Sequence, residues 1–101
     1  MKYGYLGSMR VRHGYRDEVV AILLSGVDGL RAAGCDLYLV GVSDDDPTMI
    51  WVTEVWQSKA AHDASLSLPA TRAAIATAMP LLTGEFTRQE LTMVGGLGLP
   101  A

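Results

Sequence analysis

Four stretches of the chain combine apolar, β-branched and aromatic residues in the short runs that predict β-strands. The first stretch covers residues 3–12, in which Gly7 predicts a weak point or a bulge. The second covers residues 35–43, and the third covers 49–56, which is dense in β-branched and aromatic residues. The fourth covers residues 85–94. The pattern therefore predicts a sheet of four strands.

Between these strands the apolar spacing becomes helical. One helix is predicted before a stop at Gly34, with an apolar face made of Val20, Leu23, Leu24, Val27 and Leu30. Ser58 is a good N-cap for a short helix over residues 59–66. Pro69 suits the first turn of a further helix that Pro80 kinks or ends. The face of that helix would combine Leu68, Arg72, Ile75, Met79 and Leu82.

The resulting order, β-α-β-β-α-β, is that of a ferredoxin-like α+β sandwich, in which an antiparallel sheet carries both helices on one face. A chain of 101 residues has the length of one domain. We expect that domain over residues 1–94, followed by a Gly-rich C-terminal tail over residues 95–101.

The second and third predicted strands are apolar on both of their faces. In the third strand one face carries Ile50, Val52 and Trp56, and the other carries Trp51 and Val55. An antiparallel sheet with one face in water shows polar alternation instead, and this chain has no third layer to cover a second apolar face. We therefore expect a homodimer that buries this sheet face against its own copy.

Composition and charge exclude several classes of protein. The net charge of −3, from 11 acidic and 8 basic residues, argues against a nucleic-acid surface. The longest apolar run is about five residues, whereas a membrane helix needs ~18, and the N-terminal segment lacks the apolar core of a secretory signal. Cys35 is the only cysteine, which excludes an internal disulfide and favours a reducing cytoplasm.

Two residues of the third strand are candidates for chemistry. Glu54 and Trp56 share a face because side chains alternate along a strand. If that face meets the helices, burial would raise the pKa of Glu54 and suit it to proton transfer near neutral pH. In the alternative, Glu54 lies near the rim and accepts hydrogen bonds from a capped helix or from Arg72. Trp56 could form a pocket wall against an aromatic substrate, although a Trp at a strand end is more often plain core.

His62 is the third candidate, because an unperturbed histidine is the natural proton carrier at neutral pH. It sits one turn into the short helix over residues 59–66. The alternative is a surface or semi-buried histidine without a chemical role. Neighbours one apart on a helix do not face each other, so we expect no direct contact between His62 and Asp63.

The sequence carries no motif for a metal or an organic cofactor, and we expect neither. Neither His13 nor His62 belongs to a local metal-ligand pair, and the acidic turn over residues 44–46 lacks the spaced ligands of a calcium loop. If the protein is an enzyme, its substrate must be reactive enough to need only positioning and proton transfer. Electron-rich phenols, quinols and anthrones meet that requirement.

Nearly the whole chain resembles the antibiotic biosynthesis monooxygenase family, in particular its quinol-monooxygenase-like branch. The most specific part of the resemblance is E-V-W-x-S-K-A-A-H-D-A-S-L, which leads into the helix at Pro69. The segments that carry the resemblance are GYRDEVVAILL, AGCDLYLV, DPTMIWVTEVWQSKAAHDASLSLP, RAAIATAMPLL and the closing VGGLG.

The resemblance implies a dimeric α+β barrel and cofactor-independent oxygenation of aromatic polyphenols. Glu54 and Trp56 match the family's E-x-W segment, and His62 matches a position that recurs among close relatives. Many members carry a histidine where this chain has Ser65, and close relatives often end in G-G-H-G where this chain has Leu97. The haem-degrading branch pairs a strand-one Asn with a Trp and a His, and strand one here has no Asn, which argues against haem degradation.

We therefore expect a cofactor-free monooxygenase that oxidises a quinol-, anthrone- or polyphenol-like aromatic with O₂. Glu54 or His62 would take a phenolic proton, and Trp56 would form a pocket wall. Tyr38 and Arg72 would orient substrate oxygens. The alternative is a non-catalytic dimeric α+β domain that binds a small apolar metabolite, and an isomerase or decarboxylase on the same fold is a third possibility.

Overall fold

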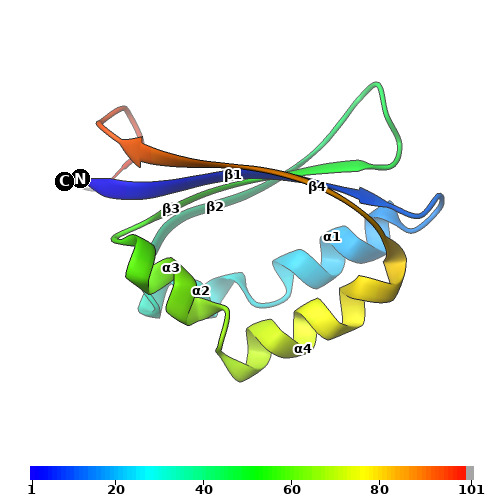
Figure 1. Ribbon diagram of the computed structural model, residues 1–101, viewed down its shortest axis with the longest axis horizontal. Coiled ribbons are helices and arrows are strands. Elements are labelled where there is room, and N and C mark those ends of the chain that lie inside the picture. The colour runs from blue at the N-terminus through cyan, green and yellow to red at the C-terminus, as the bar shows by residue number, and fades with distance from the viewer. Residues whose placement is uncertain (100–101) are drawn as a thin grey trace.

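The computed structural model describes residues 1–99, which form one four-stranded sheet with its helices on a single face (Figure 1). The elements in chain order are β1 (Lys2–Val11), α1 (Arg16–Leu24), α2 (Val27–Ala32), β2 (Cys35–Val42), β3 (Met49–Trp56), α3 (Lys59–Ser65), α4 (Pro69–Ala78), the 3-10 turn η1 (Met79–Leu81) and β4 (Leu82–Met93). This order confirms the α+β ferredoxin-like fold. Of the tail predicted over residues 95–101, the last two residues lie outside the described part of the chain.

The sheet has the strand order β2-β3-β1-β4, and every neighbouring pair is antiparallel. β3 and β1 are therefore the central strands. The register places Glu54 of β3 between Tyr5 of β1 and Tyr38 of β2. Because directly opposed residues share a face, these three side chains lie on the same side of the sheet.

Two groups of buried side chains lie between the sheet and the helices. The larger group is aliphatic and consists of Val11, Val19, Ile50, Val52 and Leu82. The smaller group lies where β3 ends and α3 begins, and consists of Tyr3, Cys35 and Trp56. Trp56 is 1% exposed, so its indole is almost fully removed from water. The aliphatic group is the larger of the two, and the aromatic group sits beside the elements that carry the polar candidates.

The prediction of one continuous helix before Gly34 is wrong, because the segment forms two helices. α1 ends at Leu24, the hydroxyl of Ser25 donates to the Ile22 carbonyl at 2.6 Å, and α2 begins only at Val27. Gly26 lies between the two helices, and a glycine in a helix interior costs about 1 kcal/mol relative to alanine. Leu24 is accordingly left exposed, although the periodicity predicted that it would face the core.

The apolar face predicted for the helix that begins at Pro69 is also wrong. α4 buries Ala78, whereas Leu68, Ile75 and Met79 are exposed. α4 packs beside α1. Leu82 belongs instead to β4, where it joins the aliphatic core.

The face of the sheet turned away from the helices carries exposed apolar side chains. Leu39 of β2 is 56% exposed, Trp51 of β3 is 42% exposed and Leu91 of β4 is 44% exposed. In Figure 1 all helices lie on the opposite side, so no element of residues 1–99 covers this face. Strand β3 is apolar on both sides, as the absence of polar alternation in residues 49–56 predicted. No helix within residues 1–99 combines the length and the apolarity that crossing a bilayer requires.

The start of α3 depends on one side chain, and this gives a first prediction. The hydroxyl of Ser58 accepts a hydrogen bond from the Ala61 backbone N–H at 3.0 Å. Ser58→Ala leaves that N–H without its partner, so we expect a loss of about 1 kcal/mol in the free energy of unfolding, measured by urea denaturation. Ser67→Ala, an exposed position just beyond α3, is the matched control and should change stability by less than about 0.5 kcal/mol. Equal losses in both variants would contradict the role of Ser58 as the cap.

Candidate functional site

The candidate site is a cluster of aromatic side chains around His62 of α3. The ring centroid of His62 lies 5.1 Å from that of Tyr3, 5.3 Å from that of Tyr5 and 5.6 Å from that of Trp56. The Tyr5 ring is nearly parallel to the imidazole, at 22°, and the Trp56 ring meets it edge-on, at 82°. His62 is 8% exposed, so the ring is enclosed rather than resting on the surface.

Local sequence rules explain why these rings meet. Tyr3 and Tyr5 are two apart on β1 and so project from the same face, and the register places Tyr3 opposite Trp56. The chain leaves β3 at Trp56 and enters α3 at Lys59, so the first turn of α3 returns over the end of the sheet. That turn brings His62 onto the three rings.

Gly7 gives the Tyr5 ring its place, and the bulge predicted there is wrong. The pairing of β1 runs without interruption through Gly7, and the register shift against β4 lies between Met9 and Val11. A Cβ at Gly7 would lie 2.8 Å from the ring carbon Cε1 of Tyr5 and 3.2 Å from the Thr87 carbonyl oxygen. The absent side chain therefore leaves room for the ring that stacks on His62.

Glu54 is the carboxylate nearest the centre of the sheet. It is partly buried, and its Oε1 accepts a hydrogen bond from the indole Nε1–H of Trp56 at 2.9 Å. Burial raises the pKa of the Glu54 carboxyl above its usual value, while the hydrogen bond from Trp56 and the charge of His62 offset part of this rise. The carboxylate therefore accepts a proton more readily than a glutamate in water.

Tyr38 lies beside Glu54 on the neighbouring strand. Burial, and next the negative charge of Glu54, raise the pKa of the Tyr38 phenol well above its usual value. The hydroxyl therefore keeps its proton across the neutral range and is available as a hydrogen-bond donor.

Asp63 contacts His62 directly, which the sequence argument had excluded. Oδ1 of Asp63 lies 3.0 Å from Nδ1 of His62. Adjacent residues project from different sides of a helix, but Nδ1 is the ring nitrogen closest to the backbone, and the short Asp63 side chain reaches it sideways. The expectation that neighbours one apart cannot interact was therefore wrong for this pair.

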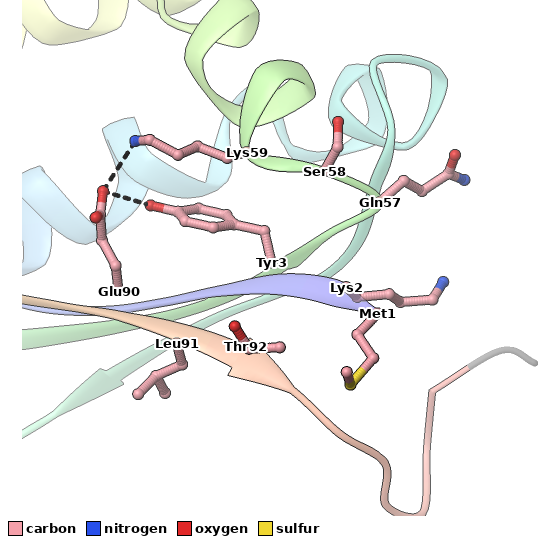
Figure 2. Close-up of a pocket in the computed structure, with 9 residues that line it drawn as sticks. All are labelled: Met1, Lys2, Tyr3, Gln57, Ser58, Lys59, Glu90, Leu91 and Thr92. Carbon is pink, nitrogen blue, oxygen red and sulfur yellow. Dashed lines mark hydrogen bonds and ion pairs between the residues drawn. The ribbon is translucent and has the colours of Figure 1, made fainter.

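Asp63 also joins a polar network at the edge of the sheet. Lys59 Nζ lies 3.5 Å from Oδ2 of Asp63 and 3.0 Å from Oε1 of Glu90, and that same Glu90 oxygen accepts the Tyr3 hydroxyl at 3.1 Å. Figure 2 shows the Lys59 and Tyr3 side chains both reaching Glu90. The network connects the outer side of the His62 cluster to β4.

Two hollows lie on either side of the cluster. The first, of about 440 Å³, opens at the end of β1 and β4 and is the one drawn in Figure 2. Its lining residues are Met1, Lys2, Tyr3, Gln57, Ser58, Lys59, Glu90, Leu91 and Thr92. The second, of about 220 Å³, lies between α2 and β2, and Cys35 and Tyr38 are part of its wall. Tyr3 is the cluster residue in the wall of the first hollow, and Glu54, Trp56 and His62 line neither of the two.

The structure brings four of the five predicted site residues together: Tyr38, Glu54, Trp56 and His62. Arg72 is not among them, because it is exposed on α4. Its role in orienting substrate oxygens stays a prediction. The alternative in which Glu54 bonds to Arg72 at the rim is wrong, since the partner of Glu54 is the Trp56 indole.

Sequence reasoning missed three members of the cluster: Tyr3, Tyr5 and Asp63. The period-two spacing of Tyr3 and Tyr5 shows that they share a face, but only the register against β3 reveals which face that is. Within residues 1–99, no group of three or more His, Cys, Asp or Glu side chains is arranged to hold a metal ion.

Comparison with known proteins identifies the family. The family model for antibiotic biosynthesis monooxygenase matches residues 3–77, which is well over half of the chain. The chain belongs to the antibiotic biosynthesis monooxygenase family. This confirms the resemblance drawn from the E-V-W segment, at the level of the family.

Solved structures of the antibiotic biosynthesis monooxygenase fold agree with this assignment. A candidate antibiotic biosynthesis monooxygenase from Chloroflexus aurantiacus J-10-fl is 42% identical, with a TM-score of 0.89 over 99% of this chain and 100% of that chain. A Mycobacterium tuberculosis protein is similar in fold at 21% identity, with a TM-score of 0.81 over 96% of this chain and 99% of that chain. A candidate family member from Caulobacter crescentus CB15 also has 21% identity, with a TM-score of 0.84 over 93% of this chain and 91% of that chain. No curated protein matches the chain.

The environment of Glu54 in this antibiotic biosynthesis monooxygenase family member predicts an unusual pH dependence of stability. The folded protein holds the Glu54 proton more tightly than the unfolded chain does, so this contribution to stability is present at low pH. It is lost as the pH rises from about 4.5, the ordinary value for Glu, through the raised pKa of the folded state. Glu54→Gln removes the titration, so the stability of the variant relative to wild type should increase with pH in that window.

Glu90→Gln is the matched control with the opposite sign. Hydrogen bonds from Lys59 and Tyr3 lower the pKa of Glu90. Its ionised form therefore stabilises the folded state above the ordinary pKa of Glu, and this stabilisation is lost as the pH falls through the lowered pKa of the folded state. The stability of Glu90→Gln relative to wild type should therefore decrease as the pH rises towards 4.5. Urea denaturation of wild type and the two variants from about pH 3 to about pH 7 measures both differences in the free energy of unfolding. Parallel curves for the two variants would contradict the assigned environments.

Proposed function

We propose that this protein is a cofactor-free monooxygenase that oxidises a quinol-, anthrone- or polyphenol-like aromatic with O₂. The observation that carries the proposal is the environment of the Glu54 carboxylate. It is partly buried among aromatic rings and accepts a hydrogen bond from the Trp56 indole, and burial raises its pKa. A carboxyl of this kind suits general-base catalysis near neutral pH. Membership of the monooxygenase family supports the reaction class.

The chemistry needs the base first and O₂ second. Glu54 removes a phenolic proton, so the O–H bond breaks and the substrate becomes an electron-rich phenolate. The phenolate passes one electron to O₂, and the two radicals combine to form a carbon–oxygen bond at the activated ring carbon. For an anthrone the resulting hydroperoxide loses water, so that the CH₂ group becomes C=O, and one O₂ gives one carbonyl oxygen and one H₂O.

The neighbours of Glu54 supply the other requirements of this scheme. Trp56 offers a rigid aromatic surface, and its N–H holds the carboxylate in one orientation. Tyr38 keeps its proton at neutral pH and can donate a hydrogen bond to a substrate oxygen. The rings of Tyr5 and Tyr3 enclose the side of the cluster that faces β1.

Oxygen consumption with dithranol or menadiol as substrate tests the proposal, with metal-free and flavin-free protein in an O₂ electrode. We expect kcat to fall at least about 100-fold in Glu54→Gln, because the base is lost, and substantially in Trp56→Phe, because the carboxylate loses its donor. Glu18→Gln, an exposed glutamate on α1, is the control and should match wild type. With dithranol, one O₂ should be consumed per anthrone without accumulation of H₂O₂. Equal rates in wild type and both site variants would refute the proposed roles of Glu54 and Trp56. Ligand binding without any O₂ uptake would favour the non-catalytic alternative.

We further propose that the protein is a homodimer joined through the apolar sheet face that no helix covers. Leu39, Trp51 and Leu91 are the exposed residues that such an interface would bury. A two-fold interface suits one self-complementary face, and burial of apolar area is the main favourable contribution to association.

Sedimentation at micromolar concentration checks the dimer. Trp51→Glu places a charge in the middle of the proposed interface, so we expect a monomer. Ile75→Glu is the control, because Ile75 on α4 is exposed to a similar extent, 46% against 42%, and lies outside the interface. It should remain dimeric. A monomeric wild type, or equal effects of the two substitutions, would refute the interface.

A further inference from the structure

The imidazole of His62 is fixed in orientation from several sides. Its side chain is 11% exposed, with Tyr5 stacked at 22°, Tyr3 tilted at 44° and the edge of Trp56 at 82°. These rings fix the plane of the imidazole, but a half-turn about its Cβ–Cγ bond would leave the ring contacts almost unchanged. What distinguishes the two nitrogens is the contact with Asp63. One of them, Nδ1, lies 3.0 Å from Oδ1 of Asp63.

The chemistry of Asp63 decides where the ring carries its proton. The hydrogen bond from His62, and to a smaller extent the charge of Lys59, lower the pKa of Asp63, so it is an ionised carboxylate at neutral pH. An ionised carboxylate has acceptors only. Nδ1 must therefore carry the hydrogen in this contact, and the lone pair of the neutral ring lies on Nε2.

The hydrogen bonds around His62 indicate that Nε2 is accessible to water. Within residues 1–99 no hydrogen bond reaches Nε2, and no side-chain nitrogen or oxygen buried from water lacks a partner. Nε2 therefore touches space that water can enter. The titratable and charged groups around the ring are Tyr3 and Tyr5 from β1, Glu54 from β3, Lys59 and Asp63 from α3 itself, and Glu90 from β4 through Tyr3.

We propose that Asp63 is a positioning residue that holds His62 as the Nδ1–H tautomer and so presents Nε2 as a proton acceptor at the site. In the reaction, a proton taken from a substrate hydroxyl or from Glu54 forms an Nε2–H bond, and Asp63 stabilises the resulting imidazolium. The proton returns to the peroxide oxygen that leaves as water. This catalytic part rests on the proposed oxygenase function, whereas the tautomer does not.

Long-range ¹H–¹⁵N NMR of the full chain at about pH 8, above the ordinary pKa of histidine, reads the tautomer directly. The only other histidine is His13, which is exposed and provides an internal reference. We expect wild-type His62 to show a protonated Nδ1 and an unprotonated Nε2. Asp63→Ala should shift the population towards Nε2–H, while Lys59→Gln, which removes the other partner of Asp63, should leave Nδ1–H in place.

Two NMR results would overturn the proposal: an Nε2–H tautomer in wild type, or identical tautomers in wild type and Asp63→Ala. Asp63 is exposed at the surface, so its substitution should leave the fold intact, which the NMR spectrum of the backbone verifies at the same time.

The kinetic arm uses the O₂ assay with dithranol. Asp63→Ala should lower kcat about tenfold or more and change its pH profile, while Asp45→Ala, at an exposed aspartate in the turn between β2 and β3, should stay within about twofold of wild type. An altered tautomer with unchanged kcat and pH profile would overturn the catalytic part alone. Absence of O₂ uptake in wild type would instead refute the proposed function and leave the tautomer result standing.

Discussion

The antiparallel register of β1 against β3 is the constraint on which the rest of the structure depends. It sets Tyr3 against Trp56 and Tyr5 against Glu54, all on the side that meets the helices. A slip of one residue would turn every one of these side chains to the other face of the sheet. Farther along the same pair, Met9 lies against Ile50 in the aliphatic core. The packing that stabilises the domain therefore also fixes the geometry of the candidate site.

The site combines two polar regions with different surroundings. Glu54 lies in a largely apolar layer, where the Trp56 indole donates a hydrogen bond to it. Removing that donor would leave a desolvated carboxylate without this hydrogen bond, which costs free energy. The outer network of Lys59, Glu90 and Asp63 is exposed, and ion pairs of that kind contribute little to stability. Its effect is to orient Tyr3 and His62, which are the residues it shares with the cluster. Stability and orientation are therefore supplied by different groups.

The sequence predicts the order of the elements well, because each signal is local. The predicted third strand, residues 49–56, agrees with β3, and Ser58 and Pro69 mark the starts of α3 and α4 as expected. The errors arise where tertiary contacts override the local pattern. Helical periodicity continued across Gly26, although the helix breaks there. Nothing local to α4 reveals that it buries Ala78 and leaves Ile75 exposed.

The candidate site was predictable only in part for the same reason. Glu54 and Trp56 were found because both lie on one strand at a spacing of two, which needs no knowledge of partners. Tyr5 was missed because its place in the site comes from a strand pairing across 49 residues, Tyr5 to Glu54. Asp63 was excluded because residues one apart on a helix project in different directions. That rule describes the directions of the Cβ atoms, and it does not describe how far a carboxylate reaches towards the nearer ring nitrogen.

The presence of two proton acceptors in one small cluster has a physical explanation in their different access to water. Glu54 is partly buried, and its affinity for a proton falls when His62 is positively charged. A proton held on Nε2 of His62 therefore favours an ionised Glu54, which is the state that a base needs before a new substrate arrives. Nε2 touches space that water can enter, so the ring holds that proton outside the apolar layer until it returns to the peroxide oxygen. In the proposed oxygenase, the carboxylate performs the abstraction within the ring cluster, and the imidazole stores the proton until the peroxide takes it.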